Sequence, residues 1–472
     1  MACLAAIGAA SQGAFFHNFY DGGIAPSAGT FVLHGLIPYR DFWFLYGPLV
    51  GYVMAIPNLL FGPSLDINRV LGVVLLGLQG ATGYALLRRV APPGLAAIFA
   101  VGSVVVPLRG VTVDPTAWTL ALLPATAAMS VAARRDERPR AAVLTGMLLG
   151  ISFLLRLDVG AYATAACLLV ATRRRRLIAT WLCVVLPVTA ALIAVVPWSS
   201  LYEQVVWYPI VGPRLYRPFT PTPLDPGLGF QAFLDTLLLA VVPRIGLGLA
   251  VIGTVISRDR SRALVATVAF ALLCQLQTLG RGDTYHFGQA ATPAVLAIGA
   301  ALASLHSVPR LQRASAAALA AVIGLVCGLG LYWFAGPVDP YRRQIEEASA
   351  FVRAVTARDE PIFVGLTENR FTFNNPLFVY SLADRSPGSR LTMYNPGVTN
   401  TDAGQSTIVD DLEHTGTRYL VLDRVHALEH DPEGLGSVAG STILDRYISS
   451  HFVVARDFGL IVVMTRTTSA TE

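Results

Sequence analysis

The sequence is short of charge and contains no lysine. Only 14% of its 472 residues are charged and 54% are hydrophobic, whereas a soluble globular protein carries roughly 25% charged residues. A single buried core cannot absorb that deficit, so we expect most of the chain to face lipid. The net charge of +5 comes from arginine alone. Because the arginines cluster in short segments between apolar runs, this charge does not indicate nucleic-acid binding.

Recognisable metal, disulfide and phosphate-loop motifs are also missing. The five cysteines stand singly in apolar stretches without a CxxC pair, which argues against a zinc site or a disulfide framework. We expect them to act as small buried side chains. The C-terminal part has no Gly-rich phosphate loop, no nucleophile elbow and no internal repeat. The chemistry of this polytopic membrane protein must therefore come from its few polar segments.

Long apolar runs predict a mainly α fold, a bundle of about eleven membrane-spanning helices. The runs lie near 1–16, 67–87, 94–110, 116–133, 141–157, 160–172, 177–197, 231–256, 263–280, 288–305 and 314–335. The first run is shorter than the roughly 20 residues a span needs, so we expect its helix to begin upstream of Met1. Residues 47–62 are also apolar, but two prolines interrupt them, and we interpret them as a re-entrant or interfacial helix.

Arginine-rich loops indicate the orientation of these helices, because such loops stay cytoplasmic. With eleven spans and a cytoplasmic N-terminus, five arginine groups lie on the cytoplasmic face of the inner (plasma) membrane: 88–89, 134–140, 173–176, 258–262 and 310–313. The segments that carry isolated acids or histidine near a span then lie on the exoplasmic face, and so does the C-terminal region.

The C-terminal residues 337–472 have more charge and alternate between helical and β-branched runs. We predict helices at 345–357, 376–383 and 407–414, and strands at 361–365, 418–423 and 460–465. The chain thus divides into a transmembrane domain, 1–336, and a small soluble exoplasmic α/β domain, 337–472. Within the first domain, an exoplasmic loop at 17–66 carries interfacial helices.

The polar insert 19–48 is the most informative part of the chain, because carboxylates at a membrane edge are costly and usually functional. Asp21 follows the first apolar run and is our candidate general base. The alternative is an Asp that caps an interfacial helix. Further along, Arg40 and Asp41 lie among aromatic residues. These two could contact an amphiphilic ligand, with Arg for phosphate, or form a surface ion pair within an aromatic belt.

Other charged residues lie on the same predicted face. Asp114 is either a second catalytic carboxylate or a cap of the next helix, with Pro115 at its first position. Arg156 and Asp158 interrupt an apolar run. Since positions i and i+2 do not share a helix face, we expect each to have a partner on another element. The turn before the tenth run carries further candidate substrate-binding residues, Arg281, Asp283 and His286.

The loop motif resembles the GT-C superfamily of integral membrane glycosyltransferases, the class of protein O-mannosyltransferases and aminoarabinose transferases. Its members carry an acid pair soon after the first span, followed by a pattern that here reads Ala28, Gly35–Asp41, Gly47–Leu49, Phe61-Gly62 and Arg69. Where many members have Asp-Glu, this chain has Asp21-Gly22. The acid set is therefore Asp21, alone or with Asp114. The resemblance assigns no certain cofactor and leaves a divalent metal as an option.

The resemblance implies an inverting transfer of a sugar from a polyprenyl-phosphate donor in the membrane lipid to the hydroxyl of an acceptor it does not identify. Asp21 would take the acceptor proton, and Arg281 or Arg156, helped by His286, would stabilise the departing phosphate. Two other functions remain open from the residues alone. About eleven spans with intramembrane charges also suit a transporter or flippase, and the C-terminal domain suits a non-catalytic membrane scaffold that binds a partner.

Overall fold

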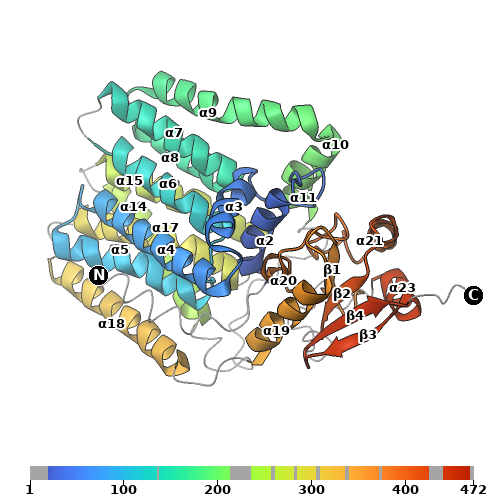
Figure 1. Cartoon of the computed structure of the whole chain (residues 1–472). Coiled ribbons are helices and arrows are strands. Elements are labelled where there is room, and N and C mark those ends of the chain that lie inside the picture. The colour runs from blue at the N-terminus through green and yellow to red at the C-terminus, as the bar shows by residue number, and fades with distance from the viewer. Residues whose placement is uncertain are drawn as a thin grey trace, which may run out of the picture. The chain divides into compact units, whose positions relative to one another are not determined.

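The computed structural model describes residues 20–134, 138–212, 235–256, 261–280, 284–304, 309–334, 340–370, 375–424 and 440–467. Over these residues the fold is mainly helical, with one small sheet (Figure 1). It divides into two compact units, each assembled from separate stretches of the chain. Unit 1 comprises Met1–His17, Arg69–Leu192 and Phe219–Gly336; unit 2 comprises Asn18–Asn68, Ile193–Pro218 and Pro337–Glu472. The predicted domain boundary at residue 336 stays a prediction.

Unit 1 is a helical bundle whose elements follow the apolar runs. They are α4 (Leu65–Leu87, which begins in unit 2), α5 (Pro93–Val105), η2 (Val106–Arg109), α6 (Ala117–Ala132), α7 (Pro139–Leu155), α8 (Leu157–Val170), α9 (Arg174–Val195), η5 (Leu237–Val241), α14 (Val242–Ile256), α15 (Arg262–Cys274), α16 (Gln277–Gly280), α17 (Thr284–Ser304) and α18 (Pro309–Phe334). The run at 1–16 lies outside the described residues.

Five described helical stretches are long and apolar enough to cross a membrane: Leu65–Leu87, Arg174–Val195, Leu237–Val255, Arg262–Leu279 and Tyr285–Ser304. Several shorter apolar helices accompany them. These helices are those of a membrane protein, while the count of eleven spans stays a prediction. Within unit 1, α17 is the central helix, since 83% of its most apolar window is buried, against 6% in α9.

Small residues allow the close packing of α17. A Cβ on Gly299 would lie 2.7 Å from the ring of Phe99 on α5, so only glycine lets the two helices approach this closely. The alanines of α17 share a core with Phe99, with Leu247 on α14 and with Leu264 on α15. Dispersion contacts between such closely spaced helices stabilise a bundle in lipid, where hydrophobic burial between helices is weak.

Unit 2 joins the polar insert to the C-terminal region. Its helices are α2 (Asp21–Leu33), α3 (Leu49–Phe61), α10 (Trp198–Leu201), the π-helical turn η3 (Tyr202–Trp207), α11 (Tyr208–Ile210), α19 (Pro340–Val355), α20 (Phe378–Ala383), α21 (Asp402–His414) and α23 (Ile443–His451). The strands are β1 (Ile362–Leu366), β2 (Tyr419–Asp423), β3 (Phe452–Asp457) and β4 (Ile461–Arg466).

The four strands form one mixed sheet in the order β1-β2-β4-β3 (Figure 1). β1 and β2 are parallel, with Val364 opposite Val421, and the other pairs are antiparallel. Helix α19 packs against β4 and α20, and buries Ile345, Ala348 and Val352 at helical spacing. The helices and strands predicted in this region are confirmed, although α23 and β3 were not predicted.

Candidate functional site

Asp21 is the first residue of α2, and its side chain is half-buried. The nine residues that follow it and Phe31 are all buried, because α2 is rich in glycine and alanine. A Cβ on Gly29 would lie 2.6 Å from the backbone of Met54 on α3, and one on Gly23 would lie 2.4 Å from the Phe378 nitrogen on α20. Helix α2 is thus fixed between α3 and α20. An acidic residue in its first turn also suits the helix dipole.

Arg40 and Asp41 form a two-point ion pair, with Nε to Oδ1 and Nη2 to Oδ2 both at 2.8 Å. The backbone N–H of Ile37 donates to Asp41 as well. Burial favours the neutral carboxyl, but the hydrogen bonds from Arg40 and Ile37 and the charge of Arg40 outweigh it, so the pKa of Asp41 is lowered. Tyr39 precedes the pair with φ of 68° and is held by a hydrogen bond to the Tyr46 carbonyl.

Gln204 on the π-helical turn η3 holds this loop from the other side. Its Oε1 accepts from the Phe44 N–H at 2.8 Å, and its Nε2 donates to the Tyr39 carbonyl at 3.0 Å. The Trp43 N–H donates to the Arg390 carbonyl at 2.7 Å. The segment 39–44 is therefore fixed to two other stretches of unit 2 through its backbone.

An open cleft of about 440 Å³ lies beside this segment within unit 2. Arg40 and Trp43 line it from the loop, Glu203 and Trp207 from η3, and Arg390 from the segment before α21. This size falls within the range of small-molecule sites, about 300–1,000 Å³. Glu203 is an exposed wall residue of this cleft.

In unit 1, Asp114 lies buried on the loop between η2 and α6. The Thr112 hydroxyl donates to its Oδ2 at 2.8 Å. The alternative reading of Asp114 as a helix cap is wrong, because Thr116 caps α6 through a reciprocal capping box with Thr119. Pro115 therefore precedes the helix, and Asp114 needs another explanation. Gly72 on α4 gives this loop room, since a Cβ there would lie 1.9 Å from the Val113 oxygen.

Arg156 and Asp158 bind each other, with Nε and Oδ1 2.9 Å apart. The expectation that they would not face each other is wrong, because it assumed one helix. Arg156 instead has an extended backbone, with φ of −156°, and joins α7 to α8. Arg156 does have partners on other elements: its Nη2 donates to Gln277 on α16, and its guanidinium lies 5.1 Å from the Trp118 ring on α6.

Two further arginines of unit 1 were not singled out from the sequence. Arg109 forms a partly buried two-point pair with Asp235, at 2.8 and 3.0 Å. Arg244 on α14 donates to the Ala240 carbonyl and the Thr278 hydroxyl, and lies 4.2 Å from the Phe287 ring. Its position inside the apolar run 231–256 is a signal that could have found it, since charges in such runs are costly.

His286 lies in the first turn of α17, half-buried, with its ring 5.7 Å from that of Tyr285. The predicted contacts Arg281 and Asp283 lie outside the described residues. Over the described ranges, no three His, Cys, Asp or Glu side chains gather as a metal site. The structure thus groups Arg40 and Asp41 with Asp21 in unit 2, and places Asp114, Arg156, Asp158 and His286 in unit 1.

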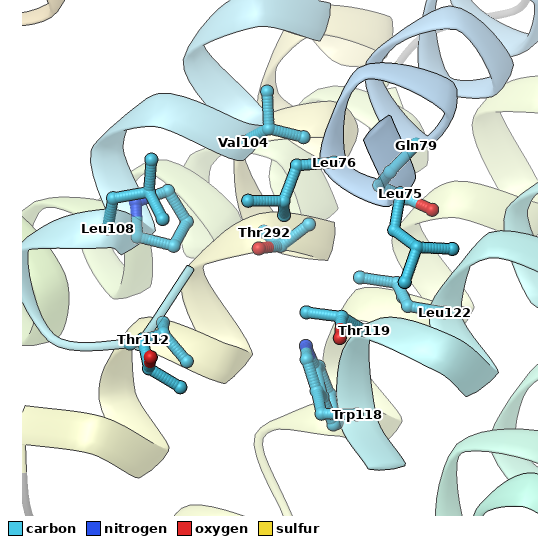
Figure 2. A pocket seen from close by; sticks show the side chains of 12 residues that line it. Leu75, Leu76, Gln79, Val104, Leu108, Thr112, Trp118, Thr119, Leu122 and Thr292 are labelled. Atoms are coloured by element: carbon cyan, nitrogen blue, oxygen red, sulfur yellow. The ribbon is translucent and has the colours of Figure 1, made fainter. Parts of the chain in front are cut away.

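A small internal cavity of about 20 Å³ also lies in unit 1. Figure 2 shows side chains of α4, α6 and α17 around it, with Thr112, Thr119 and Thr292 among its polar residues. A cavity of about 10–15 Å³ is enough to hold one water molecule. This cavity is therefore too small for a sugar, and it belongs to the packing beside the Asp114 loop.

One stretch of the chain is similar to a known protein family. A family model described as dolichyl-phosphate-mannose-protein mannosyltransferase matches residues 46–201. That stretch contains Asp114, Arg156 and Asp158, and it begins after Asp21 and Arg40. No curated protein sequence matches the chain.

Solved structures decide the fold. ArnT from Cupriavidus metallidurans, bound to undecaprenyl phosphate, matches with a TM-score of 0.53 at 13% identity, covering 98% of this chain and 97% of ArnT. This chain has the GT-C glycosyltransferase fold. The Archaeoglobus fulgidus oligosaccharyltransferase in complex with Zn and sulfate matches with a TM-score of 0.51 at 13% identity, covering 98% of this chain and 72% of that one. The archaeal AglB, in complex with an inhibitory peptide and a dolichol-phosphate, has a TM-score of 0.50 at 14% identity, covering 96% and 71%.

The GT-C fold confirms the resemblance that the loop motif indicated. It agrees with the mainly helical structure and with its five candidate membrane spans among the described residues. The fold alone assigns no role to the individual charged residues.

Proposed function

We propose that this protein is an inverting glycosyltransferase that moves a sugar from a polyprenyl-phosphate donor to an acceptor hydroxyl at the exoplasmic membrane face. The observation that carries the proposal is the GT-C fold together with the mannosyltransferase family match over residues 46–201. ArnT with undecaprenyl phosphate and AglB with a dolichol-phosphate support a lipid-phosphate donor. The arginine-rich loops support an orientation in which the N-terminus is cytoplasmic and residues 337–472 are exoplasmic.

Asp21 is the proposed general base. Its carboxylate accepts the proton of the acceptor hydroxyl as that oxygen forms a bond with the anomeric carbon. The bond from this carbon to the phosphate oxygen breaks, and polyprenyl phosphate leaves with the electron pair from the opposite face, which inverts the anomeric centre. A well-placed base is worth about 10²–10⁴-fold in rate. The fixed position of α2 between α3 and α20 supports the role, because it leaves the Asp21 backbone little freedom.

Asp114 is the proposed second acid, which orients the acceptor. The Thr112 hydroxyl donates to its Oδ2 at 2.8 Å and so helps to orient the carboxylate. A metal is not needed in this scheme, and Gly22 stands where many GT-C members carry the second acid of a pair. Every step is therefore assigned to the chain's own side chains.

Arg244 is the proposed principal contact of the leaving phosphate. Arg109 and Arg156 are each neutralised by a carboxylate, Asp235 and Asp158. Among the described residues, the partners of Arg244 are neutral: a carbonyl, a hydroxyl and a phenyl ring. A guanidinium in an apolar helix whose described partners are all neutral is suited to bind a phosphate group. Arg156, Arg281 and His286 are proposed to assist, with Asp158 orienting Arg156 and Asp283 contacting the sugar.

The experiment uses the full chain in nanodiscs with polyprenyl-phosphate sugars (mannose, arabinose and aminoarabinose) and cell-envelope acceptor. We expect Asp21→Asn to lower transfer by about 10²–10⁴-fold with donor binding unchanged. Arg244→Gln should weaken donor binding as well as turnover. Asp66→Asn is the matched control, because Asp66 is a largely exposed carboxylate of unit 2 paired with Arg342.

Unchanged turnover in Asp21→Asn would contradict its role as the base. Donor binding that is unaffected in Arg244→Gln would contradict the phosphate contact. Suppose that no donor of the panel gives a glycosyl product, while lipid or solute crosses the membrane of proteoliposomes that contain the protein. This result would refute the transferase and favour a transporter.

A further inference from the structure

The cleft of about 440 Å³ in unit 2 is formed by three stretches that are far apart in the sequence. The loop contributes Arg40, η3 contributes Glu203 and Trp207, and the residues around α21 contribute Arg390 and Thr407. The family match ends at residue 201 and begins at 46, so most of these residues lie outside it. All of them belong to one compact unit.

The walls of the cleft are fixed by hydrogen bonds between side chains and backbone groups. Gln204 holds the loop at Tyr39 and Phe44, and the Tyr208 hydroxyl donates to the Pro396 carbonyl at 3.0 Å. The Trp43 ring packs edge-to-face on Tyr208, with centroids 5.8 Å apart. A ligand would therefore meet a preformed site, which lowers the entropic cost of binding.

The accessible surface of the cleft combines an aromatic ring with planar polar groups. Trp207 is half-buried and Glu203 is exposed. The side chains of Arg40 and Arg390 are 41% and 60% exposed, respectively. An indole face offers a platform for the C–H face of a sugar ring, while guanidinium and carboxylate groups bind neighbouring hydroxyls two at a time.

The charge balance argues for a neutral ligand. Each arginine has a carboxylate close by: Asp41 binds Arg40 at 2.8 Å, and Asp411 lies 3.8 Å from Arg390. Glu203 adds a further negative charge. A phosphate or carboxylate group would have to displace these acids, whereas hydroxyl groups can both donate to the carboxylates and accept from the arginines.

We propose that this cleft binds the acceptor, and that the acceptor is a neutral oligosaccharide chain. The inference rests on the proposed function, since it names the acceptor of that reaction. The charge balance disfavours an acidic glycan. A peptide would need a free strand edge or apolar side-chain pockets, and the strands of the described sheet contribute no residue to the cleft.

The test measures binding of soluble probes to the full-length protein in nanodiscs by titration calorimetry. The probes are α-1,6-mannotetraose, α-1,5-arabinotetraose, chitotetraose and a Ser/Thr-rich acceptor peptide. We expect one neutral tetrasaccharide to bind, and Trp207→Ala and Arg390→Gln each to weaken it about tenfold. The matched controls are Trp198→Ala and Arg343→Gln, because both side chains are exposed and lie outside the cleft. The controls should bind as the unchanged protein does.

Absence of binding by all three saccharides would overturn the proposal. Binding of the peptide alone, with loss in Trp207→Ala, would replace the saccharide by a protein acceptor. The Asp21→Asn variant should lose transfer and still bind the saccharide, because Asp21 does not line the cleft. Saccharide binding by the unchanged protein, without transfer from any donor of the panel, would refute the transferase and not the cleft. Transfer whose acceptor KM is unaffected by Trp207→Ala would refute the cleft and not the transferase.

Discussion

Gln204 offers the sharpest test of how the segment 39–44 is held in place within unit 2. Its amide uses both ends, accepting from the Phe44 N–H and donating to the Tyr39 carbonyl. The orientation of the amide is fixed by chemistry, because a backbone N–H can only donate and a carbonyl can only accept. Phe44 and Tyr39 are 1% and 2% exposed, so water is poorly placed to replace either bond.

Replacing Gln204 by leucine keeps the buried volume and removes both bonds. Each buried backbone group left without a partner costs about 1–3 kcal/mol. The loop can relax toward water, so we take the lower part of the summed range, about 2–4 kcal/mol of local stability. Because 1.4 kcal/mol is a factor of ten, local opening should increase about 30- to 1,000-fold.

Amide hydrogen exchange read by mass spectrometry on peptides covering residues 39–46 measures this opening. Gln204→Leu should accelerate exchange there by the factor above, and Gln204→Glu should do so less, because its carboxylate still accepts from Phe44. Val206→Ala is the control, since Val206 is 40% exposed on the same turn and should leave exchange unchanged. If the exchange rate of these peptides in Gln204→Leu stayed within about threefold of the rate in the unchanged protein, the reasoning would be refuted.

Two further predictions concern packing and pH. Gly29→Ala should destabilise the protein by about 2–3 kcal/mol, because its Cβ would lie 2.6 Å from the Met54 backbone. Gly248→Ala on α14 meets nothing within 4 Å and should be neutral or stabilising by about 0.5–1 kcal/mol in the same thermal unfolding assay. The two-point bond from Arg418 lowers the pKa of Glu360. The pair therefore stabilises the folded protein at pH values above the usual glutamate pKa, and this stabilisation is lost as the pH falls through the lowered pKa of Glu360. Glu360→Gln should therefore reduce the loss of thermal stability on acidification, by about 1 kcal/mol or less since Arg418 is exposed; an unchanged acid profile would contradict this.

The helical part of the fold was predictable because lipid-facing helices need long apolar runs, which survive as a simple signal in one sequence. The strands β1, β2 and β4 were predictable because their short β-branched runs are also a simple signal in one sequence. Strand β3 was not, because only Phe452 of its six residues is buried and its pattern is that of a surface. An exposed edge strand carries little hydrophobic signal.

The candidate site was only partly predictable, because its key contacts depend on backbone geometry and on distant pairings. The extended backbone at Arg156, which turns it toward Asp158, is not encoded in a periodicity. The bond between Gln204 and Phe44 spans 160 positions. Two signals were available: the spacing of Thr116 and Thr119, which marks a capping box, and Arg244 within an apolar run. A local motif can be read from sequence, whereas a partner far along the chain cannot.

The grouping of the chain into units changes how the competing functions can be separated. A scaffold whose C-terminal region binds a partner would lose function when residues 337–472 are deleted. In unit 2, however, α2 is supported by that same region: the Ser27 hydroxyl donates to the Leu377 carbonyl at 2.6 Å, and Phe31 packs on the Tyr380 ring. The deletion would therefore remove the support of Asp21 as well, and a transferase would lose activity too. Only a point change such as Asp21→Asn, which leaves these contacts in place, distinguishes a catalytic carboxylate from a structural one.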